Sequence, residues 1–212
     1  MKLIKLTLSS LAIIILIASC ATSAPTRFYT LSVPVQSQQS TAKATTIAIE
    51  VLPVNVPERL KRPQLVINTQ GAQLKVLEQD RWSSSFNDEL HDVFASGIAN
   101  QTGALEVSHG GRVANQAIYR IAITLRQLDA VPGGNIVADF AWTITRVDVG
   151  SRNIDPTSAK DHAISCQLAL TKPVGSSIDA MVQGMQATVA EVVAAISANI
   201  VSLNANKEAE CG

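Results

Sequence analysis

The sequence predicts an α+β fold in which an antiparallel-dominated sheet carries two long helices on one face. Two segments, 117–131 and 135–149, alternate apolar and polar residues and are separated by Pro-Gly-Gly, which is the pattern of a long antiparallel hairpin. Two other segments, 81–101 and 177–204, repeat their apolar residues every three or four positions, as amphipathic helices do. The order is strands, helix, strands, helix, which favours a sheet covered by helices.

Four shorter strands are expected before the first helix. Residues 27–33 and 46–54 alternate apolar and polar side chains in the manner of strands. Residues 64–69 and 73–79 do the same on either side of Gly71, and this arrangement predicts a second hairpin.

The first helix is expected between Arg81 and Gln101, and Gly103 just beyond it is a stop signal. A strand at 104–108 follows this helix, and a strand at 159–173 precedes the second helix. The apolar positions that define the two helices are Trp82, Phe86, Leu90, Val93, Phe94 and Ile98 in the first, and Ile178, Met181, Met185, Val189, Val192, Val193, Ile196, Ile200 and Leu203 in the second.

The first 19 residues have the pattern of a secretory signal peptide. Lys2 and Lys5 precede an apolar run at 6–19, whose fourteen residues are fewer than the roughly 20 that cross a bilayer. The run ends in Ile-Ala-Ser-Cys, which resembles the lipobox that bacterial lipoprotein signal peptidase recognises. In that chemistry the thiol of Cys20 receives a diacylglycerol and the new amino group is acylated. The alternative is an ordinary signal peptide cut nearby, which would leave a free cysteine.

The residue after the expected anchor bears on where the protein goes. Lipoproteins kept at the inner membrane usually carry Asp there, and this sequence has Ala21. By resemblance to that sorting rule, the expected destination is the periplasmic leaflet of the outer membrane. Residues 20–26 then form a lipidated tether whose last six residues reach at most ~20 Å, so the single domain at 27–212 is expected close to the lipid surface.

Composition excludes several functional classes. The precursor has 17 basic and 17 acidic residues, and loss of Lys2 and Lys5 with the signal leaves 15 against 17. This balance shows no basic excess, so nucleic acid is not expected as a partner. Only eight aromatic residues occur (two Trp, two Tyr and four Phe), so the core must rest on aliphatic side chains.

Two further cysteines, Cys166 and Cys211, remain after the anchor is assigned. In an oxidising periplasm they pair with one another or stay as two free thiols, and both alternatives stay open because the sequence does not give their separation. A bridge would hold the polar C-terminal tail to the body and could stabilise it by roughly 3–4 kcal/mol.

No arrangement of catalytic or metal-binding residues is evident. Of the three histidines, His91, His109 and His162, His91 lies on the expected helix and has no second ligand three or four residues away. Neither HExxH nor CxxC occurs, so no metal site is expected. The Gly-Gly pairs lack the spacing of a phosphate-binding loop, and Ser83–Ser85 lacks a nucleophile elbow. The acidic residues of the first helix, Asp88, Glu89 and Asp92, are expected to form a polar, solvated face. The sequence therefore predicts no enzyme and no cofactor beyond the acyl groups on Cys20.

The segment from Pro53 to Pro63 contains three prolines among charged residues. Prolines fix the backbone and withhold hydrogen-bond donors, so this segment is expected to be a rigid surface loop. A rigid loop loses little entropy when it binds, and we expect Arg59, Leu60 and Arg62 to contact a neighbouring copy or a partner protein. The alternative is a simple crossover between strands with solvated charges.

Two stretches bring a family into view: VLPVNVPERLKRPQLV at 51–66 and LEQDRWSSSFNDEL at 77–90. A strand ending in proline, the VPERLKRPQLV run and an Arg-Trp pair opening a helix resemble the PqiC/YmbA-type auxiliary lipoproteins of ABC transporters. The opening FYTL at 28–31 is also similar. The resemblance is most specific over 51–90, and RWSSSF departs from the more amphipathic helix start typical of that family.

This resemblance implies a role and no reaction. Such lipoproteins sit on the outer membrane and dock to MCE-domain proteins that extend from an inner-membrane permease, in a system thought to move phospholipids or other hydrophobic compounds. The expected partners are therefore an MCE-domain protein, its permease system and further copies of this chain. The alternative is a stand-alone periplasmic lipid-binding or envelope-assembly lipoprotein with its own apolar cavity.

Overall fold

The structure is a computed structural model that describes residues 25–32, 47–69, 72–108, 117–148 and 163–205, together with 207, 210 and 211. The signal peptide, Cys20, Ala21, His109 and His162 lie outside these residues, so the predictions made for them stay predictions.

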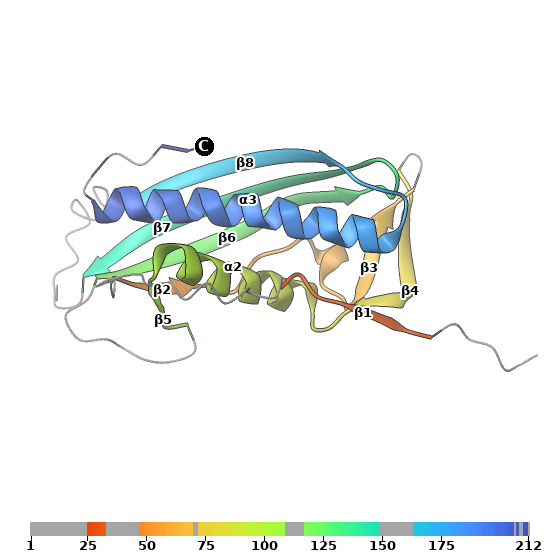
Figure 1. Ribbon diagram of the computed structural model, residues 1–212, viewed down its shortest axis with the longest axis horizontal. Coiled ribbons are helices and arrows are strands. Elements are labelled where there is room, and N and C mark those ends of the chain that lie inside the picture. Colours follow the sequence, from red (N-terminus) through yellow and green to blue (C-terminus); the bar gives the residue numbers. More distant parts are fainter. Residues whose placement is uncertain are drawn as a thin grey trace, which may run out of the picture.

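A five-stranded sheet forms the back of the molecule, with the strand order β5-β2-β6-β7-β8 (Figure 1). Its strands are β2 (Ile47–Val51), β5 (Leu105–Glu106), β6 (Ala117–Ala130), β7 (Asn135–Asp148) and β8 (Ala163–Pro173). β6, β7 and β8 are antiparallel neighbours, which confirms the long hairpin predicted from the alternating segments. β2 pairs in parallel with both β5 and β6.

A separate three-stranded sheet, of order β1-β4-β3, closes one end of the molecule. β3 (Gln64–Asn68) and β4 (Leu74–Trp82) form the predicted antiparallel hairpin. β1 (Arg27–Tyr29) pairs in parallel with the last residues of β4. The 3₁₀ helix η1 (Glu58–Leu60) connects the two sheets along the chain. The sequence predicted the strands of this second sheet, although their separation from the main sheet was not anticipated.

Two helices, α2 (Phe86–Thr102) and α3 (Ile178–Asn204), lie side by side on one face of the large sheet (Figure 1). The fold class predicted from the sequence is therefore confirmed. α2 ends at Gly103, whose φ of 68° lies in the left-handed region that glycine adopts without strain. The hydroxyl of Ser177 caps α3 by accepting a hydrogen bond from the amide of Ala180 at 3.1 Å.

The predicted start of the first helix, at Arg81, is wrong. Trp82 belongs to β4, and α2 begins at Phe86 after the N-cap residue Ser85. The Trp82 ring stacks on that of Phe86 with 5.2 Å between their centroids. The two aromatic residues thus pack together, as a helical repeat would suggest, but they do so across a strand-to-helix turn.

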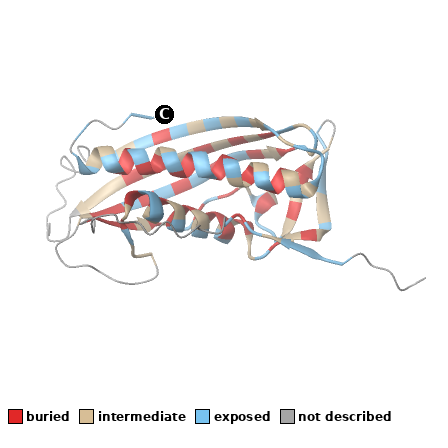
Figure 2. Ribbon diagram, in the orientation of Figure 1, coloured by how far each residue is buried: buried red, intermediate tan, exposed pale blue. Residues whose placement is uncertain are grey.

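The core lies between the large sheet and the helices, where the buried positions of the strands face the buried side of α3 (Figure 2). Phe94 of α2 meets Phe140 of β7 edge to face, with ring centroids 5.8 Å apart. The two helices approach closely at Gly97, where an added Cβ atom would lie 2.9 Å from a methyl group of Val193. A larger residue at 97 would therefore push α2 and α3 apart.

Among the described residues, α3 alone is long and apolar enough to cross a membrane by length and composition. Met181, Met185, Val189, Val192 and Ile196 recur on one side of this helix and are all at most 4% exposed. This buried side packs on the sheet, so α3 serves as the core helix of the domain.

Candidate functional site

The segment that follows the expected lipid anchor is fastened to the folded body by hydrogen bonds from side chains of β1. The Nε atom of Arg27 donates to Asp80 at 2.7 Å, and the hydroxyl of Tyr29 donates to Asp179 at 2.9 Å. Burial and then the hydrogen bond to Asp179 raise the pKa of Tyr29 to about 12, so this hydroxyl remains a donor at any physiological pH. Two residues further on, Leu31 is fully buried in the core.

Glu89 of α2 holds the same segment from the other side. One carboxylate oxygen accepts hydrogen bonds from the hydroxyl of Thr30 at 2.8 Å and from the amide of Leu31 at 2.9 Å. The other oxygen accepts from the hydroxyls of Ser83 and Ser84 and from the Ser84 amide. The Glu89 carboxylate thus joins three segments: the N-terminal strand, the turn after β4 and helix α2.

The predicted solvent exposure of Glu89 is wrong, since the residue is only 4% exposed. A buried carboxylate is tolerated when hydrogen bonds replace its hydration, and five donors do so here. Asp88 and Asp92 do lie at exposed or partly exposed positions, as predicted for a polar helix face.

The charge state of Glu89 is set by two opposed effects. Burial acts to raise the pKa of this carboxyl, but hydrogen bonds from Ser83, Leu31, Thr30 and Ser84 together outweigh burial and lower the pKa below its usual 4.5. A pKa lowered on folding means that ionised Glu89 stabilises the fold at pH values above the unfolded pKa. That contribution is lost as the pH falls through the lower pKa of the folded state.

We therefore expect Glu89→Gln to lower the melting temperature at pH 7 and to reduce the further loss seen on acidification to pH 4 and below. The amide cannot accept from all of the donors that now face the carboxylate, and it does not titrate. Thermal unfolding followed by circular dichroism at several pH values checks this. Glu58→Gln is the matched control because the Glu58 side chain is 86% exposed. Equal acid sensitivity of Glu89→Gln and the wild type would contradict the assignment.

The three residues predicted as a partner contact differ in how far they are exposed in the structure. Leu60 is 6% exposed, so its expected exposure on the loop is wrong. The 3₁₀ turn of η1 directs this side chain into the core, beside Trp82, Phe86 and Leu128. Arg59 is half-buried and donates to the carbonyl of Leu128 at 3.2 Å. Arg62 remains at the surface.

The loop around these residues is also more tightly attached than predicted. The Asn55 amide donates to the carbonyl of Ile123, and the Leu125 amide donates to the carbonyl of Asn55. The segment after β2 therefore continues alongside β6, and Arg59 and Leu60 fix it to the body. Of the three, Leu60 is the one whose burial removes it from a partner contact, and the role of Arg59 and Arg62 stays a prediction.

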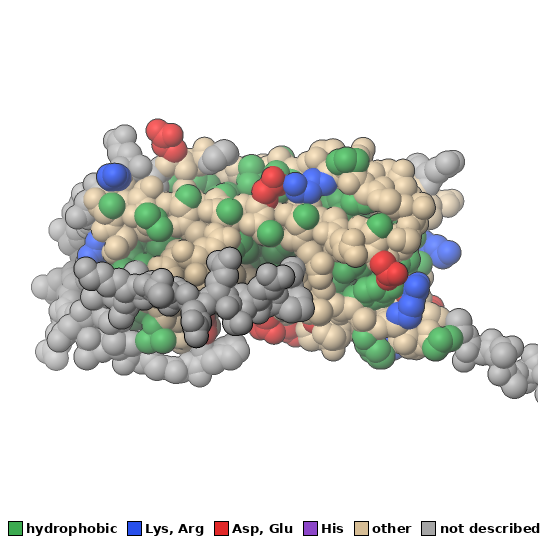
Figure 3. Space-filling model, viewed as in Figure 1, with side chains coloured by type: hydrophobic (Ala, Val, Ile, Leu, Met, Phe, Trp, Pro, Cys, Tyr) green, Lys and Arg blue, Asp and Glu red, His purple; other side chains and the backbone are tan. Residues whose placement is uncertain are grey.

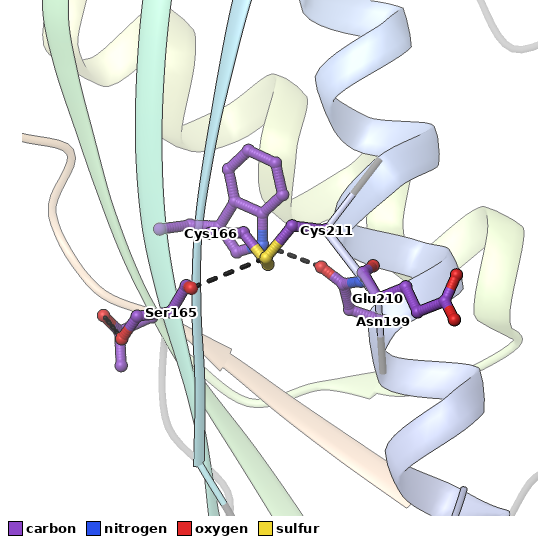
Figure 4. Close-up of a disulfide and its surroundings, with 7 residues drawn as sticks. Ser165, Cys166, Asn199, Glu210 and Cys211 are labelled. Carbon is purple, nitrogen blue, oxygen red and sulfur yellow. Dashed lines mark hydrogen bonds between the residues drawn. A yellow bond between two sulfur atoms is a disulfide. The ribbon is translucent and has the colours of Figure 1, made fainter. Parts of the chain in front are cut away.

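Cys166 and Cys211 form a disulfide, with their Cα atoms 5.4 Å apart (Figure 4). Cys166 lies on β8 and is 6% exposed, whereas Cys211 belongs to the C-terminal tail. The Asn199 side chain lies beside the bridge, donates to the carbonyl of Glu210 and accepts from the indole nitrogen of Trp142. Asn199 and the bridge together tie the tail to both α3 and the sheet.

The described part of the chain contains no group of three or more His, Cys, Asp or Glu residues that could hold a metal ion. The His91 ring is mostly buried and lies 3.2 Å, through Nε2, from the carbonyl oxygen of Val51. The polar side chains that gather near β1 and α2, including Asp80 and Glu89, are occupied by hydrogen bonds that hold the structure together. What this arrangement can do is fix the orientation of the body relative to the chain that leads to Cys20.

The model of one protein family matches residues 29–197, and its description is "ABC-type transport auxiliary lipoprotein component". The chain belongs to this family. The match covers the folded body from β1 into α3 and confirms the resemblance seen in the sequence around 51–90. Membership makes the protein a lipoprotein-type component associated with ABC-type transport.

Solved structures show the same fold. A protein of uncharacterised function superposes with a TM-score of 0.61 at 17% identity, over 83% of this chain and 99% of that one. Protein XCC0632 from Xanthomonas campestris superposes with a TM-score of 0.57 at 12% identity, over 84% and 97% of the two chains. No curated protein matches the chain in sequence.

Proposed function

We propose that the protein is an outer-membrane-anchored periplasmic lipoprotein that acts as a non-catalytic component of an MCE/ABC-type intermembrane lipid transport system. The observation that carries the proposal is the family match over residues 29–197. The lipobox-like sequence ending at Cys20 adds the anchor, and Ala21 adds the outer-membrane destination. Acyl chains on Cys20 hold the body at the periplasmic face of the membrane.

In this role the protein works by contact with other proteins. The anchored domain receives an MCE-domain protein that extends from the inner-membrane permease, and several copies of the domain assemble around it. The hydrogen-bonded carboxylates of Asp80 and Glu89 support this reading, because they serve to hold the anchor segment and are not aimed at a substrate cavity.

The second candidate is a stand-alone lipid-binding lipoprotein, which would need an apolar cavity of its own large enough for an acyl chain. The apolar cavity between the sheet and the helices, beside Leu31, Phe140 and Met185, has a volume of about 10 Å³. That is space for no more than about one water molecule, and an acyl chain does not fit. A larger cleft of about 280 Å³ lies against Val51, Asn87 and His91, but polar side chains share its lining.

The proposal is tested by co-purification from cells that express the chain together with an MCE-domain protein and a permease encoded beside it. We expect the MCE-domain protein to be recovered with the lipoprotein after cross-linking of intact cells, and the recovered assembly to contain more than one copy of this chain. Mass spectrometry of the delipidated, isolated domain supplies the contrast. A phospholipid bound to the isolated domain, with no MCE-domain protein recovered, would favour the stand-alone candidate.

A further inference from the structure

The most exposed large apolar side chain that the structure describes lies next to the anchor. Phe28 of β1 is 67% exposed. Its neighbours Arg27 and Tyr29 are held on the other side of the strand by Asp80 and Asp179, because alternate residues of a strand point to opposite faces. These hydrogen bonds fix the strand and leave the Phe28 ring turned toward solvent.

Two basic residues lie at the same end of β4 as this ring. Phe28 and Arg81 are in register across the parallel pair of β1 and β4, so their side chains share one face of the small sheet. The Trp82 amide donates to the carbonyl of Pro63, which places exposed Arg62 close to the same end of β4. Among the described residues, no acidic side chain forms an ion pair with Arg62 or Arg81, whereas Arg27 pairs with Asp80 at 2.7 Å.

Two other exposed apolar groups lie at the far end of the β3–β4 hairpin from Phe28. Leu74, at the start of β4, is 44% exposed, and Val131, just after β6, is 36% exposed. Hydrogen bonds from Asn68 to Asp129 and from the Ala130 amide to Asn68 bring the ends of β3 and β6 together at this end. Around the point where the described chain begins, Figure 3 shows hydrophobic side chains close to basic and acidic ones.

The length of the tether limits how far the end of the domain that carries Phe28 can lie from the bilayer. Phe28 is the eighth residue after Cys20, and eight extended residues span at most about 29 Å. The segment cannot swing away from the body, because Leu31 is buried and Glu89 holds Thr30 and Leu31. A lipid on Cys20 therefore brings this end of the domain to the membrane surface.

We infer that the Phe28 ring, with Arg81 beside it and Arg62 at the same end of β4, is a second membrane contact that enters the interfacial region of the phospholipid leaflet. An aromatic ring transferred from water to the interface loses unfavourable hydration. Each arginine near an anionic lipid surface adds electrostatic attraction. The inference rests on the proposed lipidation of Cys20, and it adds a fixed orientation of the domain on the membrane to the flexible attachment that a lipid alone provides.

The test replaces Phe28 with tryptophan, whose fluorescence reports contact with lipid. The lipidated Phe28→Trp protein is reconstituted into vesicles of phosphatidylethanolamine and phosphatidylglycerol, with and without acyl-chain-brominated phosphatidylcholine, which quenches tryptophan only on contact. The native Trp82 and Trp142 are 4% and 2% exposed, so they give a background that lipids do not reach. We expect Phe28→Trp to show blue-shifted emission in vesicles and a loss of emission with brominated lipid.

Val201→Trp is the matched control. Val201 is 55% exposed and lies near the C-terminal end of α3, at the opposite end of the molecule from β1. We expect no quenching there. Equal quenching at both positions, or none at Phe28→Trp, would overturn the inference. Emission that responds only when an MCE-domain protein is added would also overturn it and would assign the ring to a protein partner.

A second measurement separates failure of the contact from failure of the anchor. Flotation of the wild-type protein with vesicles reports lipidation, and the Cys20→Ser chain reports what the folded domain contributes alone. We expect Phe28→Ser and Arg81→Gln each to weaken the residual vesicle binding of the Cys20→Ser chain several-fold. Wild-type protein that floats while its Phe28→Trp variant is unquenched would keep the anchor and reject the contact. Wild-type protein that fails to float would reject the anchor.

Discussion

Cys20→Ala is expected to move the protein from the membrane fraction to the soluble periplasmic fraction, or to leave an uncleaved precursor. Each buried methylene of an acyl chain contributes ~0.8 kcal/mol to membrane binding, so removal of all acyl chains outweighs any surface contact that remains. Cell fractionation with a carbonate wash, followed by mass measurement of the released chain, checks the result.

The control for this experiment is Cys166→Ala together with Cys211→Ala, which removes the other two cysteines and leaves the lipobox intact. That double variant should remain in the membrane fraction. If Cys20→Ala protein still fractionates with the outer membrane after the carbonate wash, an anchor other than the lipid on Cys20 must hold it.

Leu60→Ala is expected to cost about 2–5 kcal/mol of unfolding free energy, as truncation of a buried leucine does. The Leu60 side chain is 6% exposed and lies beside a cavity of about 10 Å³ lined by Trp82, Phe86 and Met185. Removal of its methyl groups enlarges that cavity between the two sheets. Leu60→Asp, which also buries a charge, should prevent stable folding.

Arg62→Ala is the surface control from the same segment, and it should change the unfolding free energy by no more than about 0.5 kcal/mol. Chemical denaturation of the three variants checks both expectations. A Leu60→Ala protein as stable as the wild type would return this residue to the surface role that the proline-rich segment first suggested.

The parts of the fold that the sequence predicted well are those with long, regular patterns. The β6–β7 hairpin has fourteen residues in each strand, and the alternation of its residues fits the observed register except at an irregularity between Leu125 and Gln127. Helix α3 has 27 residues and a continuous apolar stripe. In both elements the apolar positions of the sequence pattern are the ones that face the core, so the spacing of apolar residues alone predicts the element.

The wrong predictions concern residues whose burial or pairing is determined by contacts with residues far away in the sequence. Glu89 has the sequence context of a solvated helix face, yet its partners Thr30 and Leu31 are 59 and 58 residues away. Leu60 sits among prolines and charges that suggest a surface loop, and only the packing of η1 against β4 and α2 buries it. The parallel pairing of β2 with β6 is likewise a long-range choice that no local pattern shows.

The same difference between local and long-range information applies to the candidate site. Cys20 was predicted as the lipidated residue from a short motif, because a lipobox is local in the sequence and does not depend on the fold. The residues that seat the anchor segment were not found, since Asp80, Glu89 and Asp179 come from three elements that meet only in the folded domain. The signal that could have pointed to Glu89 is its position three residues after Phe86, on the same side of the helix as a core aromatic.

The attachment of β1 has a mechanical consequence for a protein tethered at its N-terminal side. β1 runs parallel to β4, from Arg27 beside Asp80 to Tyr29 beside Trp82. A pull directed backward along β1 would load the backbone hydrogen bonds of that pair simultaneously in shear, so they would not be peeled apart one by one. Leu31 and the Glu89 hydrogen bonds share this load. Traction from a partner that spans the periplasm would thus pass into helix α2 and the core before the anchor strand detaches.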